Sequence, residues 1–170
     1  MTSRRLFPAL SLATALLLAG CGKKPVEVTR QMETEVANLL SEADFATQLR
    51  DYARAEPLLA KAVTIIPDAG ENWILLGVAR KRLNNAAGAR SAYREALAAF
   101  ERSYKADPKR TDQILQQVYV HALLGQVDKA RSLLEKAAKD HPTDRDIQEF
   151  VGAKAIDQML ADPNFKAVAL

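Results

Sequence analysis

Side chains that could do chemistry are few and scattered in this sequence. Cys21 is its only thiol, and His121 and His141 are its only histidines. Structural zinc sites draw four Cys or His ligands from close spacings, and neither histidine has a cysteine near it. We expect His121 to pack within a helix and His141 to cap a helix end. Carboxylates alternate with basic residues, as on solvated helix faces, so no acid–base pair stands out. We therefore expect no enzyme activity, cofactor or metal.

Cys21 closes an N-terminal segment that has three parts. Arg4 and Arg5 are basic, the stretch from Leu6 to Leu18 is largely apolar, and the chain then reads Leu18-Ala19-Gly20-Cys21. The apolar run is shorter than the roughly 20 residues that span a bilayer as a helix. Its length and basic flank are typical of a cleaved secretion signal, here residues 1–20. With a single cysteine, an intrachain disulfide is impossible.

The four residues that end at Cys21 resemble the bacterial lipobox. The resemblance implies cleavage after Gly20 and attachment of diacylglycerol and acyl groups to Cys21, followed by a polar tether over residues 21–30. Several acyl chains together anchor a protein stably. Gly22 is not the Asp that marks inner-membrane retention in enterobacteria, which implies the outer membrane, facing the periplasm. In an organism with one membrane, the expected location is the cell membrane. An ordinary secreted protein with a buried Cys21 is the alternative.

Composition favours one all-α domain. The chain of 170 residues is rich in good helix formers, and its seven Gly and seven Pro leave long stretches without a helix breaker. The net charge is +3, and Arg4 and Arg5 lie in the segment expected to be removed. No basic stripe carries stacking aromatic residues, so we expect no nucleic-acid binding.

A set of small and large apolar residues recurs along the chain. Ala89 and Tyr93 lie 34 residues after Ala55 and Leu59. The first and last sets are Ala55, Leu59, Ala62, Pro67 and Ala130, Leu134, Ala137, Pro142. Trp73, Leu76 and Gly77 precede the middle set, which contains Ala89 and Tyr93. This period and these residue types resemble the tetratricopeptide repeat.

The resemblance implies an all-α solenoid of antiparallel helix pairs. About three repeats fill residues 31–142, and a capping helix and tail fill 143–170. The middle repeat is longer by seven residues, nearly two helical turns, which predicts one long second helix. The expected helices are 29–48, 52–65, 70–83, 86–106, 110–124, 127–140 and 144–161, with residues 161–170 as a loose tail.

Capping residues mark several of these helix ends. Asp51, Asp128 and Thr143 are predicted as N-caps or first-turn residues, and Gly125 as a helix stop. Pro57 lies inside the second predicted helix, where it removes one hydrogen bond. We expect it to bend that helix without ending it.

In the family that the sequence resembles, the first helices of successive repeats line a concave groove that binds ligands. The corresponding residues here are Leu40, Asp44, Gln48, Ile74, Val78, Lys81, Arg82, Leu115, Tyr119 and Ala122. An apolar floor with charges at its edge suits a peptide or an amphipathic helix. The alternative is that Leu40, Ile74 and Leu115 are core residues.

Together these resemblances imply a lipid-anchored adaptor on the periplasmic face of the outer membrane. Its groove would recruit another protein of the cell envelope. The alternative is a self-associating structural lipoprotein that forms a homo-oligomer, in which a neighbour's helix or its own tail fills the groove. Both hypotheses stay open at the level of the sequence.

Overall fold

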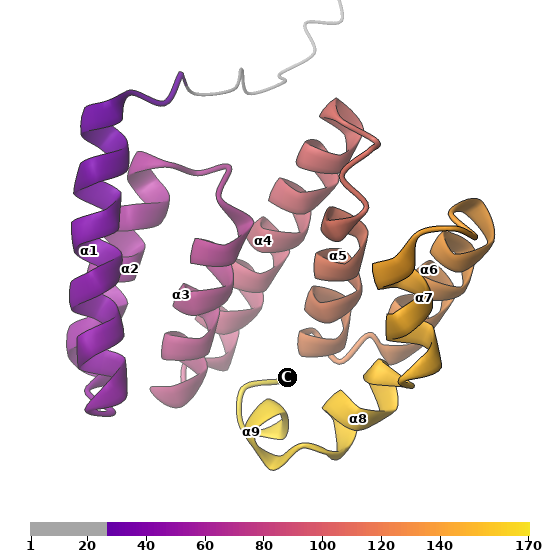
Figure 1. The fold of residues 1–170 in the computed structure, drawn as a ribbon. Helices are drawn as coiled ribbons and strands as arrows, with labels where there is room; N and C mark the ends of the chain where they lie inside the picture. The colour runs from indigo at the N-terminus through magenta and orange to yellow at the C-terminus, as the bar shows by residue number, and fades with distance from the viewer. Residues whose placement is uncertain (1–26) are drawn as a thin grey trace, which may run out of the picture.

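The computed structural model describes residues 27–170, and all regular secondary structure within them is α-helical, as predicted (Figure 1). The helices are α1 (Arg30–Gln48), α2 (Tyr52–Ile65), α3 (Gly70–Arg82), α4 (Ala86–Ala106), α5 (Asp112–Leu123), α6 (Val127–Asp140), α7 (Arg145–Gly152), α8 (Ala155–Ala161) and α9 (Pro163–Lys166). The first six match the predicted helices to within two residues at each end. The long helix α4 has the predicted bounds.

The helices pack in consecutive antiparallel pairs. α1 packs on α2, α3 on α4 and α5 on α6, while α2 contacts α3 and α4 contacts α5. In Figure 1 the first helices α1, α3 and α5 stand side by side, with α2, α4 and α6 behind them. The all-α solenoid of three helix pairs is therefore confirmed. Each pair buries its apolar faces against the next, as repeat architectures require.

One backbone motif ends the first helix of every pair. Arg50, Asn84 and Gly125 adopt left-handed backbone with φ of 59°, 60° and 71°. The amide after each donates to a carbonyl five residues back, as from Asp51 to Ala46 at 2.8 Å. This is the Schellman arrangement, which turns the chain sharply into the second helix. The predicted stop at Gly125 is thus confirmed.

Two of the three predicted N-cap or first-turn residues are confirmed, and the third is wrong. Asp51 caps α2 by accepting a hydrogen bond from the Arg54 amide at 3.1 Å. Asp128 lies in the first turn of α6. Thr143 was the wrong choice, because Asp144 caps α7 and accepts from the Ile147 amide at 3.0 Å. Pro57 lies within α2, which continues past it as predicted.

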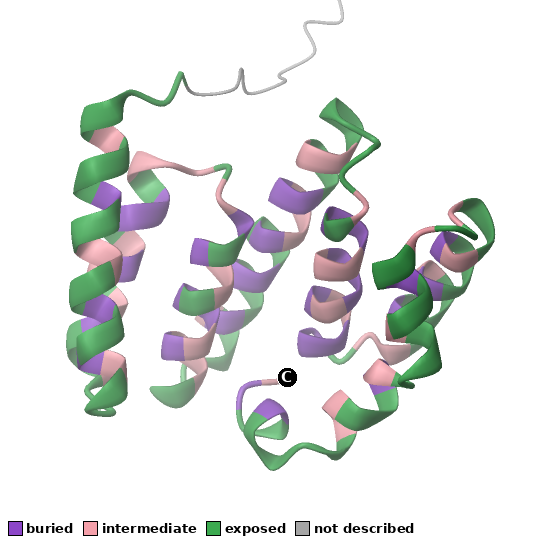
Figure 2. Cartoon of the chain, in the orientation of Figure 1, coloured by how far each residue is buried: buried purple, intermediate pink, exposed green. Residues whose placement is uncertain are grey.

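Small residues bring the helices close enough to bury large aromatic rings. A Cβ atom added to Gly77 would overlap the ring of Tyr93, and one added to Gly70 would come within 2.6 Å of the Phe100 ring. Ala89 and Ala130 are fully buried. Figure 2 shows buried residues on the faces where the helices meet. The sequence motif Leu76-Gly77 therefore makes room for a ring from the paired helix.

The C-terminal region departs from the prediction in two ways. The single helix expected over 144–161 is broken into α7 and α8 at Lys154, whose φ is 51°. The tail expected to be loose instead packs onto the repeats, and the side chains of Phe165 and Val168 are buried. Apolar side chains spaced three apart give even a short terminal segment a face to bury.

No helix within residues 27–170 is long and apolar enough to cross a membrane.

Candidate protein-binding groove

The first helices present most of the predicted groove residues to the same side of the molecule. Among these residues, Asp44, Gln48 and Arg82 are exposed, and Leu40, Ile74, Val78, Lys81, Leu115 and Tyr119 are partly buried. Ala122 is wrong as a partner contact, since it is only 1% exposed and lies in the core. Nine of the ten therefore keep some accessible surface. Several of them lie in one of two different environments, one between α1 and α3 and the other between α3 and α5.

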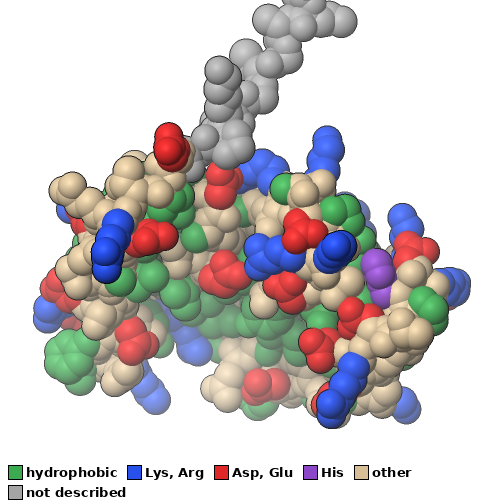
Figure 3. All heavy atoms as spheres, turned by 45° about the horizontal axis from the view of Figure 1, so that its top comes forward, with side chains coloured by type: hydrophobic (Ala, Val, Ile, Leu, Met, Phe, Trp, Pro, Cys, Tyr) green, Lys and Arg blue, Asp and Glu red, His purple; other side chains and the backbone are tan. Residues whose placement is uncertain are grey.

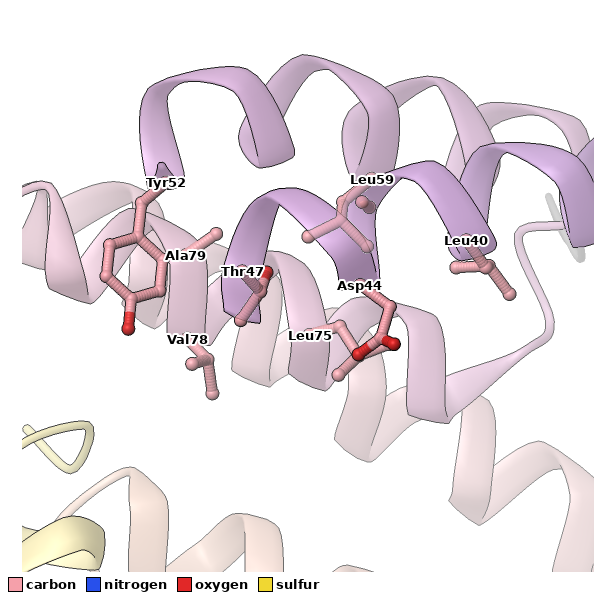
Figure 4. A pocket seen from close by; sticks show the side chains of 9 residues that line it. Leu40, Asp44, Thr47, Tyr52, Leu59, Leu75, Val78 and Ala79 are labelled. Carbon is pink, nitrogen blue, oxygen red and sulfur yellow. The ribbon is translucent and has the colours of Figure 1, made fainter. Parts of the chain in front are cut away.

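The first environment is an open apolar cleft between α1 and α3, which we call the α1–α3 cleft. It is lined by Leu40, Ala43, Asp44, Thr47, Tyr52, Leu59, Leu75, Val78 and Ala79. Figure 4 shows Leu40, Asp44 and Thr47 of α1 facing Leu75 and Val78 of α3. Its cavity is about 70 Å³, far below the roughly 300–1,000 Å³ of small-molecule sites. The α1–α3 cleft thus has the size to receive an apolar side chain from a protein.

Polar groups border the α1–α3 cleft without filling it. The carboxylate of Asp44 accepts a hydrogen bond from Gln48 Nε2 at 2.7 Å. The Arg82 guanidinium lies 5.9 Å from the centre of the Tyr52 ring, within the range of a cation–π contact. Leu75 is 47% exposed. The α1–α3 cleft thus has an apolar floor and charged groups at its edges.

The second environment, between α3 and α5, is already occupied. The C-terminal segment, Pro163–Leu170, lies against it and contributes Phe165 and Val168 to the main hydrophobic cluster. Ile74, Val78 and Tyr119 pack against that cluster. In Figure 1, α9 and the C-terminus lie below the lower ends of α3 and α5, between the two in this view. Tyr119 contacts Phe165 of this segment directly, whereas Ile74 and Val78 pack against the wider cluster, which also contains residues of α4 and α5.

Two hydrogen bonds and one ring contact hold the C-terminal segment in place. The Tyr93 hydroxyl donates to the Val168 carbonyl at 2.8 Å, and the Leu170 amide donates to the Leu123 carbonyl at 2.8 Å. The rings of Tyr119 and Phe165 meet edge to face, with centroids 5.7 Å apart. Burial raises the pKa of both tyrosine hydroxyls. They therefore stay neutral over the physiological range.

Phe150 marks a further apolar region on the other side of α5. One cavity of about 420 Å³ lies among α6, α7 and α8, where Leu134, Phe150 and Val151 contribute apolar walls. Another of similar size borders Phe150 and Leu115, with Asp146 and Glu149 at its edge. Both are wide open to solvent, and Val151 is exposed. Leu115 is the predicted groove residue that borders this region.

Sequence reasoning missed several residues that shape the groove. Leu75 and Tyr52 line the α1–α3 cleft, and Phe165 and Val168 fill the α3–α5 part. The signal for the last two was available, because an aromatic and an aliphatic residue stand three apart in the largely apolar stretch from residue 165 to residue 170. No periodic pattern in the sequence predicts that Tyr52, at the start of α2, faces the first helices.

The histidines have structural partners. His121 Nδ1 lies 2.9 Å from Gln126 Oε1, across the turn after α5. His141 caps the end of α6, as predicted, and its Nε2 lies 3.2 Å from the Tyr104 hydroxyl. Hydrogen bonds from the Thr111 hydroxyl and the Ile147 amide lower the pKa of Asp144 beside it. Within residues 27–170, no His, Cys, Asp and Glu cluster could hold a metal ion. Cys21 lies outside the described residues.

Figure 3 shows a recess lined by hydrophobic side chains across the middle of one face, with Asp and Glu side chains along its edges.

Residues 89–153, from α4 to just past α7, match the family model described as tetratricopeptide repeat. Domains of this kind are generally protein–protein interaction scaffolds without catalytic activity. No curated protein matches the sequence. The match and the paired packing of α4, α5 and α6 agree that residues 89–153 are similar to tetratricopeptide repeats.

Proposed function

We propose that this protein is a lipid-anchored adaptor that faces the periplasm from the outer membrane and binds another envelope protein through its groove. The observation that carries the binding part is the α1–α3 cleft, an apolar hollow with exposed Leu75 at its mouth. Apolar grooves between helices receive apolar side chains of protein partners in a common mode of peptide recognition. The partner would be a protein segment that inserts an apolar side chain between α1 and α3.

The anchor in this proposal rests on the sequence around Cys21. The stretch Leu18-Ala19-Gly20-Cys21 follows an apolar run with a basic start. A lipid at Cys21 would place the repeats at a membrane surface, because few residues separate it from α1, which begins at Arg30. The proposal expects the mature chain to begin at Cys21 and to carry acyl groups.

Mass spectrometry of membrane-extracted protein tests the anchor. A chain that begins at Cys21 with added acyl mass is expected, and Cys21→Ser should move the protein out of the membrane fraction. A full-length, unacylated chain in wild-type cells would contradict the anchor while leaving the groove untouched.

Site-directed crosslinking tests the groove. A photoreactive amino acid at Gln48, an exposed neighbour of the α1–α3 cleft, should form an adduct with one partner protein. The same amino acid at Lys129 of α6 is the control. Leu75→Asp should reduce the Gln48 adduct about tenfold or more, as expected when a charge meets an apolar anchor. Adducts of equal yield from both sites, insensitive to Leu75, would place the binding surface elsewhere.

Self-association is the second hypothesis, and one observation bears on it. The C-terminal segment satisfies the α3–α5 part of the groove within one chain, so a neighbour's helix is not needed there. If self-association nevertheless occurs, light scattering will show an oligomer that Leu75→Asp dissociates. A monomer over the concentrations tested would favour the adaptor.

A further inference from the structure

The C-terminal segment contacts the repeats through a simple pattern of side chains. Phe165 and Val168 are 6% and 8% exposed, while Lys166 and Ala167 between them are exposed. Their spacing of three places both anchors on one side of a single helical turn. The segment therefore presents an aromatic and an aliphatic side chain to the groove and polar or small residues to solvent.

Recognition of the segment's backbone depends little on its sequence. Tyr93 donates to the carbonyl of Val168, and the carbonyl of Leu123 accepts from the amide of Leu170. Main-chain hydrogen bonds of this kind give affinity for any peptide, while side-chain pockets give specificity. The α3–α5 part of the groove thus holds a peptide segment, and Pro163–Leu170 is the segment that it holds.

The attachment of the segment is weaker than that of the repeats. α9 has four residues, too few to be stable as an isolated helix. A short segment held by few contacts can also open locally without unfolding the elements on which it packs. The contacts that α3 makes with α4, and α5 with α6, do not include this segment. Local opening of this segment should therefore cost much less free energy than global unfolding.

Val78 links the occupied and open parts of the groove. It lines the α1–α3 cleft and also packs against the cluster that contains Phe165 and Val168. In Figure 4 the C-terminal segment is visible beyond Val78, on the side away from Leu40. A partner segment that extends from the α1–α3 cleft along α3 would meet the C-terminal segment at this residue.

We propose that the C-terminal segment is an exchangeable, built-in ligand that covers the α3–α5 part of the groove until a partner replaces it. The partner is a peptide segment with the same chemistry, an aromatic side chain followed three residues later by an aliphatic one. This inference rests on the proposed adaptor function, because it names the class of partner segment and the contact that regulates its access.

A peptide with the sequence of Asp162–Leu170, labelled at its N-terminus, tests the proposal by fluorescence anisotropy. The receptor is the folded chain carrying Phe165→Ser and Val168→Ser, in which the C-terminal segment has lost its anchors. The peptide should bind this variant at least about tenfold more tightly than wild type, where the intramolecular segment competes at high effective concentration. Lys166→Ser with Ala167→Ser, at exposed positions, is the matched control and should behave as wild type.

A further substitution in the receptor shows where the peptide binds. Tyr119→Ser, added to the variant without anchors, should weaken peptide binding, since Tyr119 contacts Phe165 edge to face. A variant that keeps its helical circular dichroism yet fails to bind the peptide would overturn the proposal. So would peptide binding that is equal in wild type and in the variant.

Hydrogen exchange on the wild-type protein decides the matter if the variant does not fold. The amide of Leu170, which bonds to Leu123, should exchange at least about tenfold faster than the amides of α5. Equal rates would show that the segment leaves only when the domain unfolds, and would overturn the proposal. None of these measurements uses an envelope partner, so failure of the crosslinking experiment at Gln48 remains a separate result.

Discussion

At the scale of single residues, Gly77 and Tyr93 connect the repeat motif to the groove. The absence of a side chain at Gly77 lets the Tyr93 ring pass between α3 and α4. The hydroxyl at the end of that ring then reaches the Val168 carbonyl. Tyr93, which packs against Gly77 in the repeat core, therefore also donates the hydrogen bond that holds the C-terminal segment.

Gly77→Ala should destabilise the protein by about 1–3 kcal/mol, because the added Cβ overlaps the Tyr93 ring and forces a shift in a packed core. Gly152→Ala is the matched control, since a Cβ there meets no atom within 4 Å. It should be neutral or stabilising by up to about 1 kcal/mol through helix propensity. Urea denaturation of the two variants measures both effects, and equal losses would contradict this packing.

Tyr93 should make stability fall at alkaline pH. Burial raises its pKa well above the ordinary value of 10. Above pH 10 the unfolded state therefore loses the phenolic proton before the folded state does, and unfolding becomes more favourable as pH rises. The contribution is intact below pH 10 and is lost as pH climbs toward the folded pKa, by up to about 1.4 kcal/mol per pH unit.

Urea denaturation at neutral pH and above pH 10 checks this dependence. Tyr93→Phe should show a smaller loss of stability over the same interval than wild type does. The pKa of Tyr119 is also raised by burial, so the variant with both residues changed should lose less still. An identical pH dependence in wild type and Tyr93→Phe would exclude this role of the buried hydroxyl.

At the scale of elements, left-handed backbone sets the angle between paired helices. Arg50, Asn84 and Gly125 end the first helices, and Lys154 follows α7 with the same backbone sign. The amide of Lys154 donates to the Val151 carbonyl at 3.0 Å, as in the earlier turns. We interpret α7 and α8 as a shortened fourth helix pair. Only Gly125 is free of the steric cost that this backbone imposes on side chains.

Arg50→Gly should therefore stabilise the protein, despite placing glycine next to a helix. Left-handed backbone costs an L-residue roughly 1–2 kcal/mol, whereas glycine costs about 0.5–1 kcal/mol in chain entropy. The net gain should be a fraction of a kcal/mol to about 1 kcal/mol. Ala37→Gly, at an exposed position inside α1, is the control and should cost about 1 kcal/mol. A loss of stability at Arg50 would argue against this turn geometry.

At the scale of the whole molecule, the core is divided unequally along the stack. α1, α2 and parts of α3 and α4 share a small cluster rich in alanine. The larger cluster joins α4, α5 and α6 with the C-terminal helices and contains most of the buried aromatic residues. Because repeats contact mainly their neighbours, stability need not be uniform along such a stack. The pair α1–α2 borders the α1–α3 cleft and lies at the weaker end.

Native-state hydrogen exchange should show α1 and α2 opening at lower free energy than α5. Leu59→Ala, in the small cluster, should lower the opening free energy of α1 and α2 by about 2–5 kcal/mol and leave α5 nearly unchanged. Leu134→Ala, in the larger cluster, is the counterpart and should act mainly on α5 and α6. If both variants destabilise every helix equally, the domain unfolds as one unit.

Local rules in the sequence determined the helices and their order. Period, caps and small residues predicted six helices, the long α4 and the stop at Gly125, because these features act within a turn or between adjacent helices. The same rules failed beyond residue 144. Lys154 carries no sequence mark of left-handed backbone, and the choice between Thr143 and Asp144 as N-cap lies within the error of any boundary.

Tertiary structure alone decided what the groove contains. The contact of Tyr93 with Val168 joins residues 75 apart in the chain, and no local pattern relates them. Ala122 shares its repeat position with groove residues, yet neighbouring helices bury it. Leu75 is exposed and the α1–α3 cleft stays open, because the contacts of the C-terminal segment are with Tyr93 of α4 and with Tyr119 and Leu123 of α5. The sequence determined which faces are apolar, whereas long-range packing decided which of those faces were covered.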